Sequence, residues 1–257
     1  MRINTNVGAL NSSKNAFINA MNTESSMRKL SSGLRISRAA DDAAGLSIAN
    51  KLRAQSRSLT VAAANSEQGN AMLQIAEGSA STIQKILERQ KELIIQREST
   101  GNNSSVTGTL NTEISTLSAE VNRIISSTNF QGSTVFTSLS FQVSDGTAGG
   151  TVSVDAALAA SSVTLASTAS ISDVDTALGA INTVLASIGA GQNRLDYTVQ
   201  NLKAAVVNVK AAESTIRDVD MAEEMANYTK NSILTQAAQA MLAQANQSSQ
   251  SVLSLLR

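Results

Sequence analysis

The chain lacks four residue types: its 257 residues include no proline, cysteine, histidine or tryptophan. Without cysteine it can form no disulfide, thiol nucleophile or thiolate metal site. Without histidine, only carboxylate-type metal sites and chemistry by serine, lysine or carboxylates stay possible. Aromatic residues make up 2% of the chain, so the large side chains that usually fill a globular core are scarce. The absence of proline leaves no residue that forces a kink in a helix.

The charges balance, with 20 basic and 20 acidic residues. A neutral chain lacks the excess of basic residues typical of nucleic-acid binding, so we expect no nucleic-acid partner. No apolar run approaches the ~18–20 residues of a transmembrane helix, so we expect no membrane insertion. Asn4, Thr5, Asn6 and Asn11 interrupt the first residues, and we therefore expect no cleavable signal peptide for general secretion.

Apolar residues recur at alternating spacings of three and four residues. Such spacing over several heptads predicts long helices that pack as coiled coils. The positions are Ile3, Val7, Leu10, Phe17 and Met21; Ile48, Leu52, Leu59, Ala62, Leu73, Ala76, Ala80, Ile83, Leu87 and Ile94; Leu110, Ile114, Leu117, Val121 and Ile124; Val174, Leu178, Ile181, Leu185, Ile188, Leu195, Val199, Leu202, Val206, Val209 and Ile216; and Leu234, Ala238, Met241, Ala245, Val252 and Leu255. The two terminal stripes are expected to be buried on each other or on other copies of the chain.

Three glycines, Gly69, Gly78 and Gly191, fall within these helical tracts. Each is expected to cost about 1 kcal/mol relative to alanine in a helix interior. A fourth, Gly33, is expected to end the first helix, with Asp41 and Asp42 capping the second.

The middle of the chain changes pattern between residues 129 and 171. Leu139, Phe141 and Val143 alternate with polar residues, Asp145-Gly146 supplies a turn, and alternation resumes at 152–154. This pattern predicts a β-hairpin. Because the segment is rich in serine, threonine and alanine and has few charges, we interpret it as an exposed insert.

Two charged blocks stand far apart in the sequence. Residues 27–58 hold seven basic and two acidic side chains, and residues 213–224 hold five acidic and one basic. Solvated faces are the ordinary explanation of such blocks, and an exposed ion pair contributes at most ~1 kcal/mol. The sharper hypothesis is that the blocks meet and fix the register between the two halves of the chain or between subunits.

No group of residues supports catalysis. Glu88, Arg89 and Glu92 are explained by ion pairs along one helix. Paired acids two residues apart, such as Asp173 and Asp175, point to different faces and cannot share a metal ion. The sequence has no glycine-rich phosphate loop and no nucleophile elbow. We therefore expect no catalytic, cofactor-binding or metal-binding residues.

Both ends of the chain carry specific motifs. They are Ile3-Asn4-Thr5-Asn6; Leu30-Ser31-Ser32-Gly33-Leu34-Arg35-Ile36, continuing through Asp41-Asp42-Ala43-Ala44-Gly45 to Ile48-Ala49-Asn50; Ile233-Leu234 with Gln236-Ala237; and Ala243-Gln244-Ala245-Asn246-Gln247 with Val252-Leu253-Ser254-Leu255-Leu256-Arg257. In this order, over roughly residues 1–130 and 175–257, they resemble the ends of bacterial flagellins.

The resemblance implies a mainly α fold of long coiled-coil-like helices. Residues 1–43 and 217–257 would form an inner terminal coiled coil, 44–128 and 172–216 an outer helical bundle, and 129–171 a short β-hairpin insert. It also implies a structural subunit that polymerises into the filament of the bacterial flagellum outside the cell, after export in an unfolded state through the flagellar type III apparatus. A hook–filament junction protein stays open as the alternative. A flagellin with a zinc-protease insert is excluded, because the chain has no histidine.

The resemblance implies partners and contact residues as well. The partners are other copies of the chain, an export chaperone at the C-terminal helix, and the filament cap and hook-junction proteins. Arg89, Leu93, Gln96 and Glu113 resemble a patch that flagellins use for packing along the filament and that the vertebrate Toll-like receptor for flagellin reads.

Overall fold

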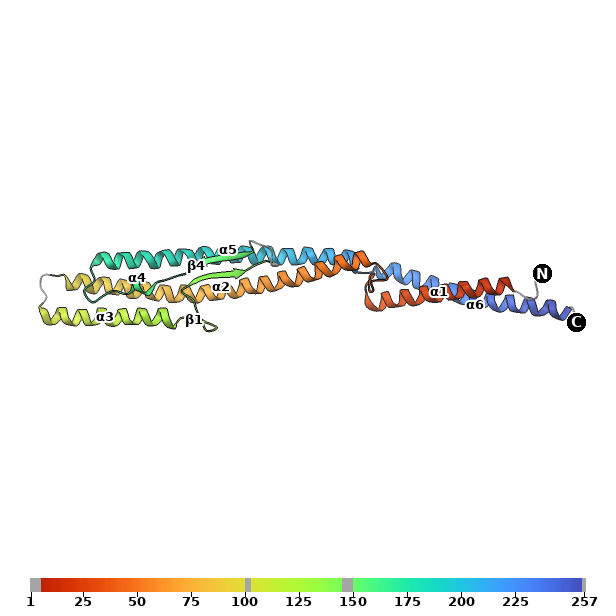
Figure 1. The fold of residues 1–257 in the computed structure, drawn as a ribbon, viewed down its shortest axis with the longest axis horizontal. Coiled ribbons are helices and arrows are strands. Elements are labelled where there is room, and N and C mark those ends of the chain that lie inside the picture. The colour runs from red at the N-terminus through yellow and green to blue at the C-terminus, as the bar shows by residue number, and fades with distance from the viewer. Residues whose placement is uncertain (1–5, 100–102, 145–149, 256–257) are drawn as a thin grey trace. The chain divides into compact units, whose positions relative to one another are not determined.

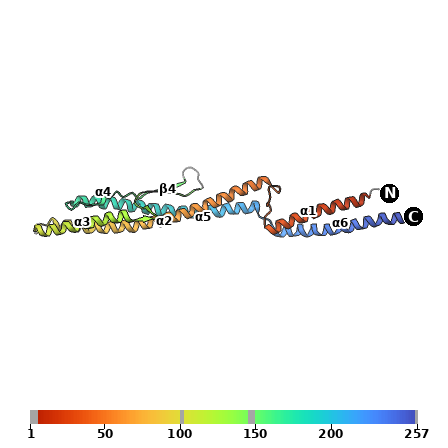
Figure 2. The ribbon, with the colours of Figure 1, turned by 60° about the horizontal axis from the view of Figure 1, so that its bottom comes forward.

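The computed structural model describes residues 6–99, 103–144 and 150–255. Figures 1 and 2 show long helices joined to two short antiparallel strand pairs. In order, the elements are α1 (Val7–Ser32), α2 (Ala43–Arg97), α3 (Ser104–Ser127), β1 (Asn129–Phe130), β2 (Ser133–Thr134), β3 (Ser138–Gln142), β4 (Thr151–Asp155), α4 (Ala160–Val163), α5 (Ile171–Arg217) and α6 (Met221–Leu255). The predicted mainly α fold with a small β insert is confirmed.

The chain divides into two compact units. The terminal unit comprises residues 1–54 and 209–257, and the central unit comprises residues 55–208. The boundaries predicted from the resemblance lie instead at the beginning of α2 and the end of α5. The compact units divide about ten residues inside these two helices, where neither helix is interrupted. The division into an inner and an outer filament layer stays a prediction.

The turn between α1 and α2 is held by local polar groups. Gly33 ends α1 in the left-handed conformation with φ 68°, and its amide donates to Lys29 O at 2.8 Å. Glycine adopts this conformation without steric cost. Asp42 caps α2, since its Oδ1 atom accepts from the Gly45 amide at 2.9 Å. These two predictions are confirmed, whereas Asp41 does not cap α2 but accepts from the amides of Ser37 and Arg38, at 3.1 and 2.9 Å.

The Asp41 carboxylate is expected to make the turn sensitive to acid. Hydrogen bonds from the amides of Arg38 and Ser37 hold the pKa of Asp41 below its ordinary value. A lowered folded-state pKa stabilises the fold above the unfolded value of about 3.9, and this contribution is lost as the pH falls through the folded value. In a pH titration, the amide NMR signals of Ser37 and Arg38 should therefore shift in a single titration step below about pH 4. Asp41→Asn should remove that step, and an unchanged step in this variant would contradict the assignment.

The two charged blocks meet within the terminal unit. Lys29 lies 3.8 Å from Glu224, and Arg53 lies 3.4 Å from Glu213. Two backbone hydrogen bonds connect the same segments: the Arg35 amide donates to Arg217 O at 2.7 Å, and the Val219 amide to Gly33 O at 3.1 Å. The prediction that the blocks meet is confirmed inside one subunit, where they lie beside this backbone connection. That they fix the register stays a prediction.

The main apolar core of the central unit is formed by α2, α3 and α5 together with residues of the segment between α3 and α5. Figure 1 shows the three helices side by side. The buried helical side chains of this core repeat at alternating spacings of three and four, as the sequence predicts for all three helices. Among them are Leu73, Ala76, Ala80, Ile83, Leu87, Ile94, Leu110, Ile114, Val121, Val174, Ile181, Ile188 and Leu195. Ile48, which the sequence places on the same stripe, is instead half exposed in the terminal unit.

Segment 129–170 packs against this core. Strands β3 and β4 pair antiparallel with Leu139 opposite Val154 and Phe141 opposite Val152, so the predicted hairpin is confirmed. Its proposed turn at 145–146 lies outside the described residues. The interpretation as an exposed insert is wrong, because alternate β4 residues and much of the chain after β4 are buried. These residues are Val152, Val154, Ala156, Leu158, Val163, Leu165 and Ala169.

A smaller hairpin, which the sequence pattern does not predict, precedes the β3–β4 hairpin. Strands β1 and β2 are joined by Gln131 and Gly132, with φ values of 51° and 84°. Two consecutive positive φ values are typical of the tight turn that matches the twist of paired strands. The sequence suggests only a helix exit here, because glutamine rarely occupies such a position.

Two glycines inside the helices receive side chains from the larger hairpin. A Cβ atom on Gly69 would lie 2.8 Å from the Phe141 ring, and one on Gly191 would lie 2.5 Å from Cγ2 of Val154. These glycines, predicted as weak points, therefore permit the hairpin to approach the helices closely. Gly78 has no such neighbour among the described residues.

Gly191→Ala should reveal this close approach. The added methyl group would meet Val154 and also lie 3.3 Å from Leu73, so we expect the variant to destabilise the central unit by about 1–3 kcal/mol. Gly179→Ala in the same helix is the matched control, because its Cβ meets no described atom within 4 Å. It should stabilise the helix by up to about 1 kcal/mol. Urea unfolding followed by circular dichroism measures both, and changes of the same sign would contradict the role of Gly191.

Helix α5 contains an 18-residue window apolar enough, by length and composition alone, to cross a membrane. One-third of the window is buried, and Val174, Ile181 and Ile188 belong to the core of the central unit. A buried core helix passes the same test as a membrane span, so the window is weak support for insertion. The expectation of no membrane insertion stays a prediction.

Candidate subunit interface

Helices α1 and α6 lie side by side in the terminal unit and run in opposite directions (Figures 1 and 2). Their less exposed positions are mostly small or polar. In α1 these include Ala9, Ser12, Ala16, Asn19, Thr23, Ser26 and Leu30, and in α6 they include Glu224, Tyr228, Asn231, Thr235, Ala238, Leu242 and Ala245. At one end, the Asn6 side-chain amide donates to Ala245 O at 3.0 Å. The contact inside the subunit therefore buries little apolar surface.

The predicted apolar stripe of α1 lies on the other side of the helix. Val7, Leu10, Phe17 and Met21 are between 54 and 66% exposed. Each of the four stands two residues before one of the less exposed positions of α1. Because a step of two residues is a rotation of about 200° around the helix axis, the stripe faces away from α6. Burial of this stripe on α6 is therefore excluded for these four residues, and burial on other copies is the remaining possibility. Ile3, which the sequence adds to the stripe, lies outside the described residues.

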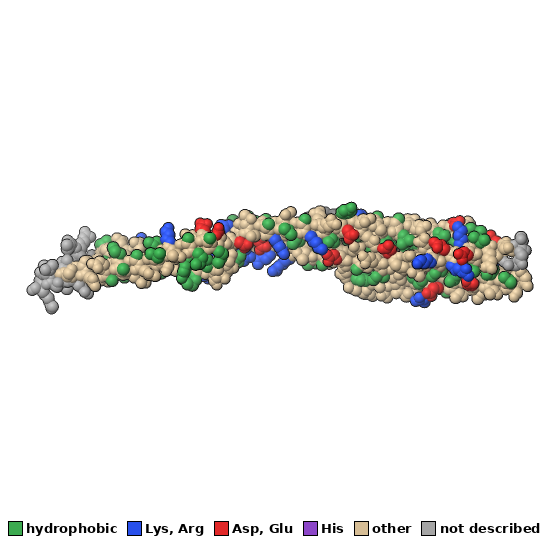
Figure 3. All heavy atoms as spheres, turned by 180° about the vertical axis from the view of Figure 1, so that it is seen from behind, with side chains coloured by type: hydrophobic (Ala, Val, Ile, Leu, Met, Phe, Trp, Pro, Cys, Tyr) green, Lys and Arg blue, Asp and Glu red, His purple; other side chains and the backbone are tan. Residues whose placement is uncertain are grey.

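Only part of the predicted apolar stripe of α6 is covered by α1. Ala238 and Ala245 are half-buried beside α1, whereas Leu234 and Met241 are 40 and 61% exposed. Leu234 and Met241 are one heptad apart and so lie on nearly the same face. The side chains of Val252 and Leu255 lie outside the described part of the chain. Figure 3 shows apolar side chains at the surface along the terminal part of the molecule.

The second predicted contact surface lies on the central unit. The Arg89 guanidinium pairs with Glu92 at 2.9 Å and with Glu113 of α3 at 3.3 Å. The hydrogen bond to Glu92, and after it the weaker effect of the bond to Glu113, raises the pKa of the Arg89 guanidinium. Gln96 is also exposed, but Leu93 is only 1% exposed and packs in the core. The structure thus brings Arg89 and Glu113 together at the surface and places Leu93 beneath it.

A buried polar group underlies this surface and was not identified from the sequence. Gln90 is fully buried, and its Nε2 atom donates to Ile114 O at 3.2 Å and to Ser118 Oγ at 2.9 Å. The Ser118 hydroxyl donates in turn to Leu165 O at 2.8 Å. The position of Gln90 on the heptad was a signal, since a polar residue at a core position requires partners.

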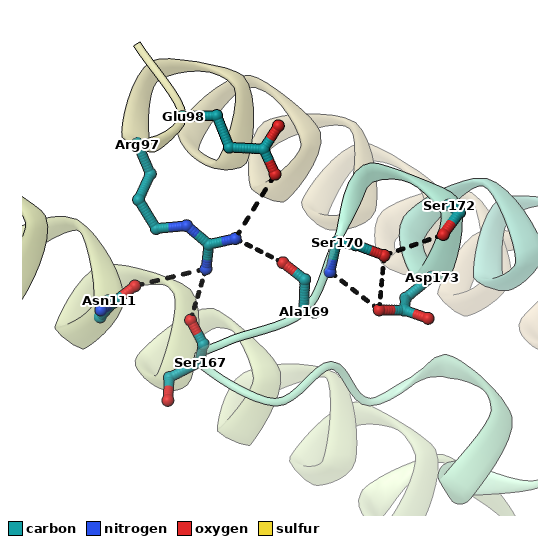
Figure 4. Close-up of polar contacts among 8 residues, drawn as sticks. All are labelled: Arg97, Glu98, Asn111, Ser167, Ala169, Ser170, Ser172 and Asp173. Carbon is teal, nitrogen blue, oxygen red and sulfur yellow. Dashed lines mark hydrogen bonds and ion pairs between the residues drawn. The ribbon is translucent and has the colours of Figure 1, made fainter. Parts of the chain in front are cut away.

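Arg97 connects three segments at the end of α2 (Figure 4). Its guanidinium donates to Ser167 O at 2.7 Å, to Ala169 O at 2.6 Å and to Asn111 Oδ1 at 3.4 Å. Asp173 accepts from the Ser170 amide and hydroxyl, both at 2.8 Å, and so caps α5. The bond from the Ser170 amide is the main cause that lowers the pKa of Asp173. These groups hold the beginning of α5 against α2 and α3.

The described residues contain no group of three or more acidic side chains placed to hold a metal ion. The depressions described on the central unit are open to solvent, and one of them, of about 610 Å³, is lined by Arg57, Ser58, Val61, Ala62, Asn65, Gln142 and Ser144. Two surface features of the described residues correspond to the predicted contact residues: the apolar stripe of α1 and the ionic surface around Arg89.

Comparison with known proteins gives matches at both ends of the chain. Residues 3–140 match the family model of the bacterial flagellin N-terminal helical region, and residues 171–256 match that of the C-terminal helical region. The chain is 42% identical over 272 residues to a flagellin of Halalkalibacterium halodurans and 39% identical over 304 residues to a flagellin of Bacillus subtilis. It is also 39% identical over 287 residues to the flagellar filament 33 kDa core protein of Treponema phagedenis. In all three pairs each chain is covered over its full length.

One solved structure also matches. It is the crystal structure of Bacillus cereus flagellin, with 27% identity and a TM-score of 0.48, covering 54% of this chain and 88% of that one.

Proposed function

The chain belongs to the bacterial flagellin family and is a structural subunit of the extracellular flagellar filament, and we propose that it assembles through the outward apolar stripe of its terminal unit. The observation that supports this route is the exposure of Val7, Leu10, Phe17 and Met21 on the side of α1 turned away from α6. Exposed apolar positions that repeat along a helix favour a protein contact. The relatives are flagellins and filament core proteins, which does not favour a hook–filament junction protein.

A filament requires that the contact be heterologous. When a stripe on one subunit meets a different surface on the next, the assembly continues as a helix unless a rotation closes it into a ring. The polar contact between α1 and α6 suits this role, since it leaves the larger apolar side chains of α1 for neighbouring copies. The family is structural, and we propose no catalytic activity.

Removal of residues 234–257 tests this proposal. The shortened chain loses Leu234, Met241 and most of the surface on which the first half of α1 packs. We expect it to stay monomeric in sedimentation, with the helical signal of the central unit retained. Normal filaments of the shortened chain in electron micrographs would overturn the proposal.

We also propose that the Arg89 surface contacts neighbouring subunits and that the Toll-like receptor for flagellin reads it in a vertebrate host. The exposed ion pair of Arg89 with Glu113 and the nearby Gln96 support contact through polar groups. Leu93 would contribute only indirectly, because its buried side chain packs this part of α2 against the core of the central unit. Arg89→Ala with Gln96→Ala should reduce receptor signalling, whereas Arg123→Ala, which breaks an exposed pair with Glu120, should not. Unchanged signalling in the double variant would contradict this role.

Export is the last part of the proposal. We propose that the chain is exported in an unfolded state, that a chaperone covers the apolar residues of α6 before export, and that the filament cap and hook-junction proteins contact the terminal unit. Leu234→Asp with Met241→Asp should weaken chaperone binding measured by calorimetry, because both side chains are exposed. Unchanged affinity would place the chaperone elsewhere.

A further inference from the structure

The methionines divide sharply between the two units. Of seven in the chain, Met1 lies outside the described residues and Met72 is 8% exposed in the core of the central unit. The other five are between 49 and 61% exposed, and all belong to the terminal unit. They are Met21, Met27, Met221, Met225 and Met241.

The composition makes these thioethers the main targets of an oxidant. The chain has no cysteine, tryptophan or histidine to compete for it. Exposed methionine reacts to give the sulfoxide, which converts a flexible apolar side chain into a polar one. With hydrogen peroxide, the O–O bond breaks, one oxygen atom bonds to the sulfur, and the other leaves as water. The sulfur is oxidised by two electrons, and the peroxide is reduced by two.

We propose that the five exposed methionines of the terminal unit are oxidation sites for peroxide, and that their oxidation stops free subunits from assembling. The selectivity among methionines stands on exposure alone. The effect on assembly rests on the proposed function, since it requires that the apolar surface of the terminal unit be buried between copies.

The position of two methionines explains why assembly is affected. Met21 belongs to the α1 stripe with Leu10 and Phe17, and Met241 lies one heptad from the exposed Leu234. A sulfoxide carries a polar oxygen, and burying it at a contact without a hydrogen-bond donor is unfavourable. Met72, the one described methionine of the central unit, is only 8% exposed, so it resists oxidation and the core of that unit keeps its packing under the same treatment.

The first experiment maps the sites. The full chain, kept monomeric, is treated with a series of hydrogen peroxide concentrations, and its peptides are weighed by mass spectrometry. We expect each of the five exposed methionines to gain one oxygen atom at least about tenfold faster than Met72. Equal rates for Met72 and the exposed five would overturn the proposed sites, whether or not the chain forms filaments.

The second experiment measures assembly by sedimentation and electron microscopy. Peroxide treatment should raise the concentration needed for polymerisation at least about tenfold, and a methionine sulfoxide reductase should restore it. The thermal unfolding of the central unit should be unchanged. Normal polymerisation of chain oxidised at all five exposed methionines would overturn the effect on assembly, whereas failure of the untreated chain to polymerise would instead contradict the proposed function.

Methionine-to-leucine variants show whether the loss of assembly comes from the five exposed methionines. Leucine has a similar volume and no sulfur, so replacing all five exposed methionines by leucine should leave assembly intact and make it insensitive to peroxide. Met72→Leu is the matched control and should stay as sensitive as the unchanged chain. Loss of assembly on peroxide treatment in the five-fold variant would overturn the proposal. If that variant fails to fold, the oxidation rates measured by mass spectrometry in the unchanged chain still test the proposed sites.

Discussion

Leu10→Asp together with Phe17→Asp is expected to abolish filament formation. Both side chains lie on the outward stripe of α1, one heptad apart, and each is more than 60% exposed in the free subunit. Placing carboxylates at a contact that becomes buried requires two charges to lose their hydration without partners. In the free subunit the same carboxylates stay in water, so its folding should change little.

The matched control adds the same charge elsewhere on the helix. Asn15 and Asn22 are also exposed and one heptad apart, but they lie off the stripe. Asn15→Asp with Asn22→Asp should polymerise far better than the stripe variant in sedimentation and electron microscopy. Circular dichroism should show both variants folded as monomers. Equal loss of assembly in the two variants would mean that added charge, rather than its place on α1, decides the result.

The sequence predicted the helices of the central unit well because their apolar stripes are buried within one chain. In α2 and α5 the heptad positions, such as Leu73, Ile83, Ile181 and Ile188, are the core positions of the structure. Here hydrophobicity and burial coincide, and the period of the pattern is sufficient to orient each helix.

The same rule fails for α1, for a physical reason. A sequence shows that a stripe is apolar, but it does not say whether the surface that covers it belongs to the same chain. The side of α1 that faces α6 is marked by Ala9, Ala16 and Thr23, whose small size permits close approach and gives little signal. Only the arrangement of the two helices in space separates the contact within a subunit from a contact between subunits.

The hairpin was misjudged for a related reason. A segment rich in serine and threonine has the composition of a surface loop, yet Val152 and Val154 on alternate positions of β4 are buried. The complementary signals lay in the helices, where Gly69 and Gly191 leave room for the hairpin. A glycine inside a helix can mark weakness or close packing, and the sequence alone does not distinguish the two.

Arg97→Met is expected to reduce the free energy of unfolding of the central unit by about 3 kcal/mol. The Arg97 side chain is 12% exposed, and it donates to the carbonyl oxygens of Ser167 and Ala169. Methionine preserves the packing of the aliphatic stem but leaves these carbonyls without their charged donor, and Ala169 is buried. Urea unfolding followed by circular dichroism measures the loss.

Two further variants separate the bridging role of Arg97 from its charge. Arg97→Lys keeps the charge but loses the planar fork that reaches two carbonyls at once, so it should recover only part of the stability. Arg123→Met removes a guanidinium that pairs with Glu120 on the exposed side of α3, and it should cost less than about 1 kcal/mol. Full recovery by lysine would mean that Arg97 acts mainly through its charge, as a cation near a helix C-terminus can. Partial recovery together with a small effect at Arg123 would show that the bridge from α2 to residues 167–169 stabilises the central unit through its geometry.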